Sequence, residues 1–277
     1  EKCPLNKSYF DIEVDISEYE ATENDAQSPI SAISYYVEST KTMYGLLLIY
    51  PDNELQKEVM GNIKKFIVEN LSNTEIKDTD INFDLRFYKD ERQLIRDFFS
   101  IFHMVKADTL MAWNSPFDTK YILNRSEILG LDVPRLVCSP EIPDEFKRIF
   151  YWADPERESK GVKVFHRLWD WVDMTNYTMI IDQMSLYSNL RKRYQLSSYS
   201  LYNVSKVELE ITKVDLSSYG LTIRNAHILN YPIFLKYSIT DTYLLYLLEK
   251  KSSDLNMFIA NCDNTRISKG VNISIII

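Results

Sequence analysis

The sequence predicts an α/β fold in which a mixed β-sheet is flanked by α-helices. Strand-like segments come first along the chain, and helix-periodic segments then alternate with a short buried strand. The chain has 277 residues, of which 45% are hydrophobic and 13% are aromatic, enough for one large domain or two small ones. This composition excludes disordered, collagen-like and low-complexity proteins.

The strands are predicted from short runs rich in β-branched and aromatic residues. The acidic stretch 17–27 is expected to be an exposed loop, and 53–82 a mixture of helix and loop. Residues 39–42 are expected to form a turn between two strands. The predicted strands are Ser8 to Val14, Ile30 to Glu38, Met43 to Tyr50, Phe83 to Tyr88 and Thr109 to Trp113.

Helices are predicted where apolar residues recur at helical spacing. The first begins after an N-cap at Asp90, and the second ends before Gly130 in a C-cap position. Turns and short strands are expected over 140–169. A short helix is expected after a cap at 197–200. Pro232 leaves the continuity of the last long helix past this residue open. The tail from Asn261 has no helical period. The predicted helices are Asp90 to Lys106, Phe117 to Leu129, Val172 to Leu190 and Ile228 to Lys250.

Charge and cysteine content exclude several functions. The net charge is −8, so bulk coating of duplex nucleic acid is not expected. The three cysteines, Cys3, Cys138 and Cys262, are far apart, which argues against a zinc ribbon or a disulfide framework and favours a reducing, intracellular compartment. The longest apolar run, Leu46 to Tyr50, is too short to span a membrane, so a soluble protein is predicted. The chain lacks an initial Met and is expected to be a piece of a longer protein.

Two carboxylates stand on the first predicted strand. Side chains at i and i+2 project from the same face of a strand, so Asp11 and Glu13 lie together and can share one divalent cation. Taken alone, the pair is a weak signal and is more typical of a solvated strand edge.

Two further pairs of polar residues recur at informative places. Asn114 ends a predicted strand and Asp118 lies in the first turn of the next helix, at the carboxyl edge where ligands of open α/β sheets bind. Tyr237 and Asp241 are four residues apart and therefore share one face of the long helix. Taken singly, Asn114 also fits a turn former and Asp118 an acid at a helix start. Likewise, Tyr237 fits a core residue and Asp241 the solvated face of a helix.

The three motifs in this order resemble the proofreading 3'-5' exonuclease domain of family B DNA polymerases. This domain is a DEDD exonuclease of ribonuclease H-like fold, in the subclass with Tyr in the third motif, and large tailed phages carry similar domains. The segment 198–204 resembles the Ser-Leu element that touches single-stranded DNA, and 264–270 resembles the entry into the polymerase palm. We therefore expect an exonuclease domain over 1–255 and the start of the palm over 256–277, without a polymerase active site.

The resemblance implies a mechanism with two divalent ions, Mg²⁺ or Mn²⁺, and a single-stranded or frayed DNA 3' end as substrate. It also implies partners: the palm, fingers, thumb and N-terminal domain of the polymerase, fused or separate. No membrane contact is expected, and the expected location is the cytoplasm, that of the host if the protein is viral. The implied catalytic residues are Asp11, Glu13, Asp118, Tyr237 and Asp241, the four acids being metal ligands, and the implied DNA contacts are Asn114, Phe117, Ser200 and Leu201.

Two other functions fit the same sequence. In the first, the domain is a non-catalytic scaffold that binds single-stranded DNA. The presence of all four acids argues against this function, because degenerate domains usually lose a metal-binding carboxylate. Alternatively, it would be an RNA-trimming exonuclease of the same fold, which differs in tolerating a 2'-hydroxyl.

Overall fold

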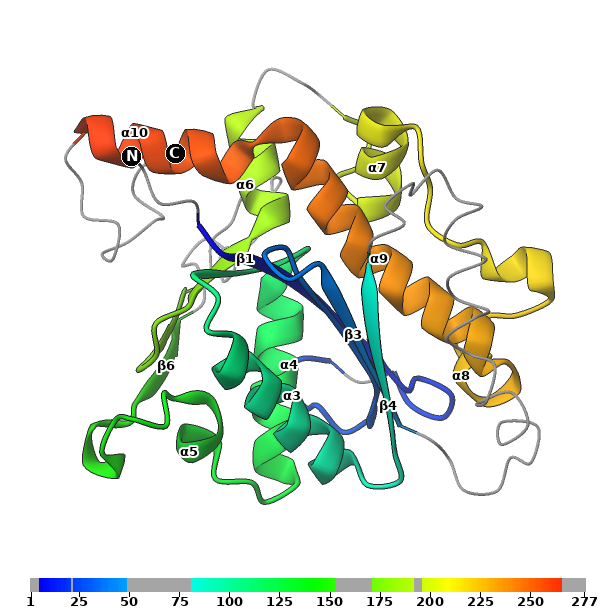
Figure 1. Ribbon diagram of the computed structural model, residues 1–277. Coiled ribbons are helices and arrows are strands. Elements are labelled where there is room, and N and C mark those ends of the chain that lie inside the picture. The colour runs from blue at the N-terminus through cyan, green and yellow to red at the C-terminus, as the bar shows by residue number, and fades with distance from the viewer. Residues whose placement is uncertain (1–4, 21, 49–80, 153–170, 192–195, 266–277) are drawn as a thin grey trace, which may run out of the picture.

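A six-stranded sheet forms the centre of the molecule, with the strand order β4-β3-β2-β1-β5-β8. The computed structural model describes residues 5–20, 22–48, 81–152, 171–191 and 196–265 (Figure 1). The strands of the sheet are β1 (Lys7–Val14), β2 (Ile30–Val37), β3 (Thr42–Leu48), β4 (Asn82–Tyr88), β5 (Thr109–Ala112) and β8 (Met179–Asp182).

The direction of the strands decides which ends meet. Strand β2 is antiparallel to β1 and to β3, whereas β5 is parallel to both β1 and β8. The carboxyl ends of β1, β5 and β8 therefore lie at one edge of the sheet, and the segments that follow these strands start from the same place.

Helices cover both faces of this sheet. Helix α9 (Tyr231–Ser252) packs on β1 and β2 from one side, while α3 (Glu91–Val105) and α4 (Ser115–Ile128) lie on the other side (Figure 1). Alternation along β1 divides its side chains between two cores: Tyr9 contacts Tyr246 of α9, whereas the next residue, Phe10, stacks on Phe98 of α3. The sheet is therefore the middle of three layers.

Small side chains let α9 approach the sheet closely. The hydroxyl of Ser34 on β2 donates to the carbonyl of Ser238 (3.0 Å) and lies 2.5 Å from the hydroxyl of Thr242. At Gly45 of β3, a Cβ atom would lie 3.2 Å from Leu235 Cδ1 of α9. These contacts fix the position of α9 over the centre of the sheet, which matters because α9 carries two of the predicted site residues.

The remaining elements are short apart from the C-terminal helix. Strands β6 and β7 form a separate two-stranded antiparallel sheet. Helix α7 packs against α9, and α10 against α6. These elements are α5 (Val133–Val137), η1 (Asp144–Phe146), β6 (Ile149–Trp152), β7 (Trp171–Met174), α6 (Gln183–Leu190), α7 (Leu201–Leu209), η4 (Leu216–Tyr219), α8 (Ala226–Leu229) and α10 (Asp254–Thr265).

The α/β fold with a mixed sheet is confirmed, as are the five predicted strands within the described residues. The predicted caps are also present: Asp90 accepts a hydrogen bond from the backbone of Arg92, Ser200 accepts one from Asn203, and Gly130 has a positive φ of 71° just beyond α4. The long helix begins at Tyr231, so that Pro232 lies in its first turn, where no intrahelical donor is lost.

Two predictions of secondary structure are wrong. The predicted helix from Val172 to Leu190 is helical only from Gln183 onward, because the residues before it form β7 and β8. The apolar run Met179 to Ile181 fits a buried strand as well as a helix, and pairing with β5 decides between them. The chain also remains helical beyond Asn261, through Thr265 in α10.

Some predictions fall outside the described residues, including those for 53–80 and 153–169. Helix α10 crosses the boundary expected at residue 255, and residues 266–277 are not described, so the division into an exonuclease domain and a palm segment stays a prediction. In the described part of the chain, no helix is long and apolar enough to cross a membrane.

Candidate functional site

Strand β1 brings the first two carboxylates to the carboxyl edge of the sheet. Asp11 and Glu13 point to the face covered by α9, while Ile12 points into the opposite core with α3 and α4. Asp11 is partly buried and Glu13 is 8% exposed. In the ladder with β2, Asp11 lies opposite Ser34, the residue that holds α9.

Helix α9 brings the third carboxylate to the same place. Asp241 is 2% exposed, and its carboxylate lies with those of Asp11 and Glu13 so that one oxygen of each falls within 4.8 Å of the others. Tyr237, one helical turn earlier, shares this face of α9. The predicted strand pair and the predicted helix pair therefore meet, although more than two hundred residues separate them in the chain.

The fourth acid, Asp118, reaches the cluster from the other side of the sheet. It lies in the first turn of α4 and is 3% exposed. The backbone N–H of Ile12 donates to its Oδ1 atom (3.3 Å), which attaches α4 to the strand between Asp11 and Glu13. Asp118 is adjacent to the cluster of three but is not one of its members.

Burial and mutual repulsion make these carboxylates reluctant to ionise. Burial first, and then the charge of Asp241, raise the pKa of Asp11 from 3.8 to about 7. The pKa of Glu13 is raised well above its usual value by burial and by Asp11, and that of Asp118 is raised by the same two causes. Burial also raises the pKa of Asp241. A site of this kind favours a bound cation, which removes the repulsion.

Lys213 belongs to this site but was not predicted from the sequence. The ammonium group of Lys213, in the segment between α7 and η4, forms an ion pair with Oδ2 of Asp241 and lies 5.5 Å from the centre of the Tyr237 ring. Burial alone would lower the pKa of Lys213, but the charges of Asp241 and Asp11 outweigh burial and raise it. Lys213 is therefore protonated and partly neutralises the cluster. No motif in the sequence marked it, because only the fold brings this loop to α9.

The donor set fits a divalent metal ion. All the groups are carboxylate oxygens, the ligands preferred by Mg²⁺ and Mn²⁺. In addition, the Oδ1 atom of Asp241 is buried and accepts no hydrogen bond within the described residues. A buried acceptor of this kind usually has a partner, and a cation beside Asp11 and Glu13 would supply one.

The four predicted DNA contacts lie near this edge but differ in exposure. Asn114 adopts the left-handed conformation (φ 63°), and its side-chain Oδ1 is buried without a hydrogen-bond partner among the described residues. Phe117 is partly buried. The indole N–H of Trp113 donates to the carbonyl of Tyr199 (3.0 Å), so the segment before α7 lies beside the end of β5.

Within that segment, Ser200 is exposed and caps α7, whereas Leu201 is 6% exposed and packs in the core. Leu201 therefore has a clear packing role. That it, or any of the other three residues, contacts DNA stays a prediction.

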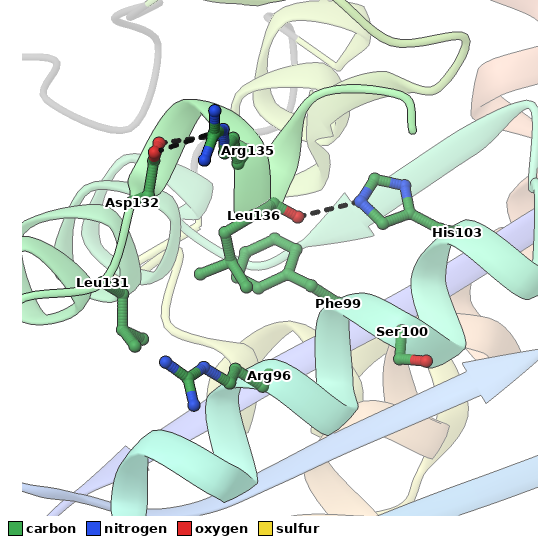
Figure 2. A pocket seen from close by; sticks show the side chains of 8 residues that line it. All are labelled: Arg96, Phe99, Ser100, His103, Leu131, Asp132, Arg135 and Leu136. Carbon is green, nitrogen blue, oxygen red and sulfur yellow. Dashed lines mark hydrogen bonds and ion pairs between the residues drawn. The ribbon is translucent and has the colours of Figure 1, made fainter. Parts of the chain in front are cut away.

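A separate pocket of about 370 Å³ lies between α3 and α5 (Figure 2). His103 there donates from Nε2 to the carbonyl of Leu136 (2.8 Å), and Arg135 forms an ion pair with Asp132. None of the predicted site residues lines this pocket, and its Arg135 also forms a closer ion pair with Asp144 (2.7 Å), outside the lining. The pocket is lined by Arg96, Phe99, Ser100, His103, Leu131, Asp132, Arg135 and Leu136.

The mixed sheet, the helices on both its faces and the acids at its carboxyl edge define an α/β protein of the ribonuclease H-like exonuclease class. The chain matches the family model for the exonuclease domain of family B DNA polymerases over residues 4–204, and it belongs to this family. It is therefore a 3'-5' exonuclease domain with a proofreading function. A comparison with curated proteins finds no match. The family match ends before Lys213 and α9, so the structure alone places those residues.

Proposed function

We propose that this domain hydrolyses the 3'-terminal nucleotides of single-stranded or frayed DNA with two bound divalent ions, Mg²⁺ or Mn²⁺. The observation that carries the proposal is the meeting of Asp11, Glu13 and Asp241 within 4.8 Å, with Asp118 hydrogen-bonded to the strand between the first two. Three carboxylates from two distant segments, all with raised pKa values, form a costly arrangement unless cations bind there.

Each acid has a distinct role in this proposal. Asp11, Glu13 and Asp241 would hold one ion, Asp11 would also reach the second, and Asp118 would hold the second ion directly or through water. When bound, the ions supply an activated water at neutral pH and stabilise negative charge on the phosphate and the leaving oxygen.

Two neighbouring groups assist the acids. Burial and the charges of Asp241 and Glu13 raise the pKa of Tyr237, so its hydroxyl stays protonated and can donate a hydrogen bond that orients the attacking water. Lys213, beside both Asp241 and Tyr237, limits the repulsion among the carboxylates and adds positive charge where a phosphate would arrive.

The substrate strand would enter near Asn114, Phe117, Ser200 and Leu201. A paired 3' end cannot place its last phosphate among the acids, so the strand must arrive single or frayed, held by stacking and backbone contacts. The further partners are the remaining domains of the polymerase, fused or separate. Much of the DNA would bind on the surface of those domains. A cytoplasmic location, and a phage origin of the chain, remain proposals that rest on the sequence.

The test is degradation of 5'-labelled single-stranded DNA in Mg²⁺ or Mn²⁺, beside an RNA strand of the same sequence and an EDTA control. We expect a ladder that shortens from the 3' end, is absent in EDTA, and is absent in an Asp11→Asn, Glu13→Gln double variant. Binding of the strand without degradation would support the scaffold function instead. Equal trimming of RNA would support the RNA exonuclease.

A further inference from the structure

A fifth buried acid lies at the same edge of the sheet and has no assigned role. Asp182 is the last residue of β8, pairs in register with Ala112 of β5, and is 5% exposed. Burial raises its pKa to about 6. It lies within the segment from Val172 to Leu190 that the sequence predicted as one helix, so its position at the end of a strand is known only from the structure.

The carboxylate of Asp182 does more than cap its own helix. Its Oδ1 atom accepts the backbone N–H of Met184 (3.1 Å) at the start of α6, and its Oδ2 atom accepts the hydroxyl of Ser185 (2.6 Å). The same Oδ1 atom also accepts the backbone N–H groups of Asn114 (3.0 Å) and Ser115 (3.4 Å) in the neighbouring turn. Two of the four hydrogen bonds therefore reach across to the start of α4.

That turn determines where Asp118 lies. Asn114 adopts the left-handed conformation (φ 63°), which asparagine tolerates better than most residues, and the hydrogen bonds from the Asn114 and Ser115 amides to Asp182 support the turn. The N–H groups of Asn114 and Ser115 stand at the amino end of α4, where helices lack internal acceptors. An acceptor placed there fixes the first turn of α4, and Asp118 is in that turn.

We propose that Asp182 is a positioning residue for the exonuclease reaction, which holds the β5–α4 turn so that Asp118 reaches the carboxylates of β1. The inference rests on the proposed role of Asp118. Asp182 acts through the backbone of Asn114 and Ser115 and does not itself contact the substrate.

Three substitutions separate this role from helix capping. Asp182→Asn keeps an acceptor oxygen for the two amides of the turn. Asp182→Ser keeps a good cap for α6 but has a side chain one atom shorter, which loses its reach to Asn114. Ser185→Ala is the matched control, because it removes a hydrogen bond of Asp182 within α6 and leaves the hydrogen bonds from Asn114 and Ser115 in place.

The first readout is hydrogen exchange of the Asn114 and Ser115 amides without metal, which does not depend on activity. We expect these amides to exchange at least about tenfold faster in Asp182→Ser, and to stay protected in Asp182→Asn and Ser185→Ala. The second readout is the rate of DNA hydrolysis against Mn²⁺ concentration. We expect Asp182→Ser to lower kcat or raise the half-saturating Mn²⁺ concentration by about 10- to 100-fold, with little change in KM for DNA.

Three results would overturn the proposal. Unchanged protection of the two amides in Asp182→Ser would show that the cross-turn contact does not matter. Lost protection with unchanged kcat and Mn²⁺ dependence would reduce Asp182 to a structural role. A wild-type protein without metal-dependent hydrolysis would instead refute the proposed function itself, and this inference with it.

Discussion

Replacing Asp11 by Asn should make the metal-free protein more stable. The pKa of Asp11 rises from 3.8 to about 7 because the side chain is buried and faces Asp241. At about 1.4 kcal/mol for each tenfold change in proton affinity, ionised Asp11 destabilises the fold by about 4 kcal/mol above pH 7. Glu13 and Asp241 share the same protons, so the gain expected for Asp11→Asn lies between about 1 and 4 kcal/mol.

The pH dependence follows from the direction of this shift. Between about pH 4 and 7, folded Asp11 still holds a proton that the unfolded chain has lost, so the wild-type free energy of unfolding falls as the pH rises. The stabilisation from protonated Asp11 is complete below pH 4 and lost above pH 7. The difference between Asp11→Asn and the wild type should therefore be largest near pH 8 and shrink near pH 5.

The assay is thermal and urea unfolding in EDTA at pH 8 and pH 5, followed by circular dichroism. Each kcal/mol should raise Tm by roughly 2–4 °C in a domain of this size. Asp173→Asn is the matched control, because Asp173 is exposed on β7 and this substitution removes the same charge as Asp11→Asn. The reasoning is refuted if Asp11→Asn is no more stable than the wild type at pH 8, or if Asp173→Asn gains as much.

Three further predictions concern residues around the cluster. Lys213→Gln removes the charge that lowers the pKa of the carboxylates, so the pH of half-maximal activity should rise by about one unit; an unchanged profile would exclude this role. Tyr237→Phe should fold normally and lower kcat about tenfold, the worth of one hydrogen bond, with KM unchanged; steady-state kinetics with full activity would contradict this. Gly45→Val should lower the free energy of unfolding in urea by about 1–3 kcal/mol and weaken Mn²⁺ binding, because an added Cβ would lie 2.9 Å from Leu85 Cδ2 and 3.2 Å from Leu235 Cδ1. If neither stability nor Mn²⁺ binding changes, α9 is not held by this close approach.

The sequence predicts those parts of the site that depend on local periodicity. Alternation on a strand places Asp11 and Glu13 on one face, and the helical repeat places Tyr237 and Asp241 on one face; the structure has both arrangements. The position of Asp118 was predictable from the rule that loops after parallel strands meet at the carboxyl edge. These features follow from backbone geometry, which the pattern of residues reveals.

Other features depend on contacts between distant segments. Lys213 has no periodic neighbours, and its ion pair with Asp241 exists only because α7 and the following loop pack on α9. The residues before Asp182 form a short apolar run, which is compatible with either a strand or a helix, and pairing with β5 makes it a strand. Because this strand was not predicted, Asp182 was not placed at the carboxyl edge of the sheet and was absent from the predicted site.

The central claim is that hydrolysis at DNA 3' ends depends on the carboxylates of β1 and α9 acting together. The most direct test is the single-turnover cleavage rate of an Asp11→Asn, Asp241→Asn double variant at saturating Mn²⁺, with folding verified by circular dichroism. We predict a loss of at least about 1000-fold, equivalent to about 4 kcal/mol of transition-state stabilisation. A folded double variant that cleaves within tenfold of the wild-type rate would contradict the claim and place the reaction elsewhere in the molecule.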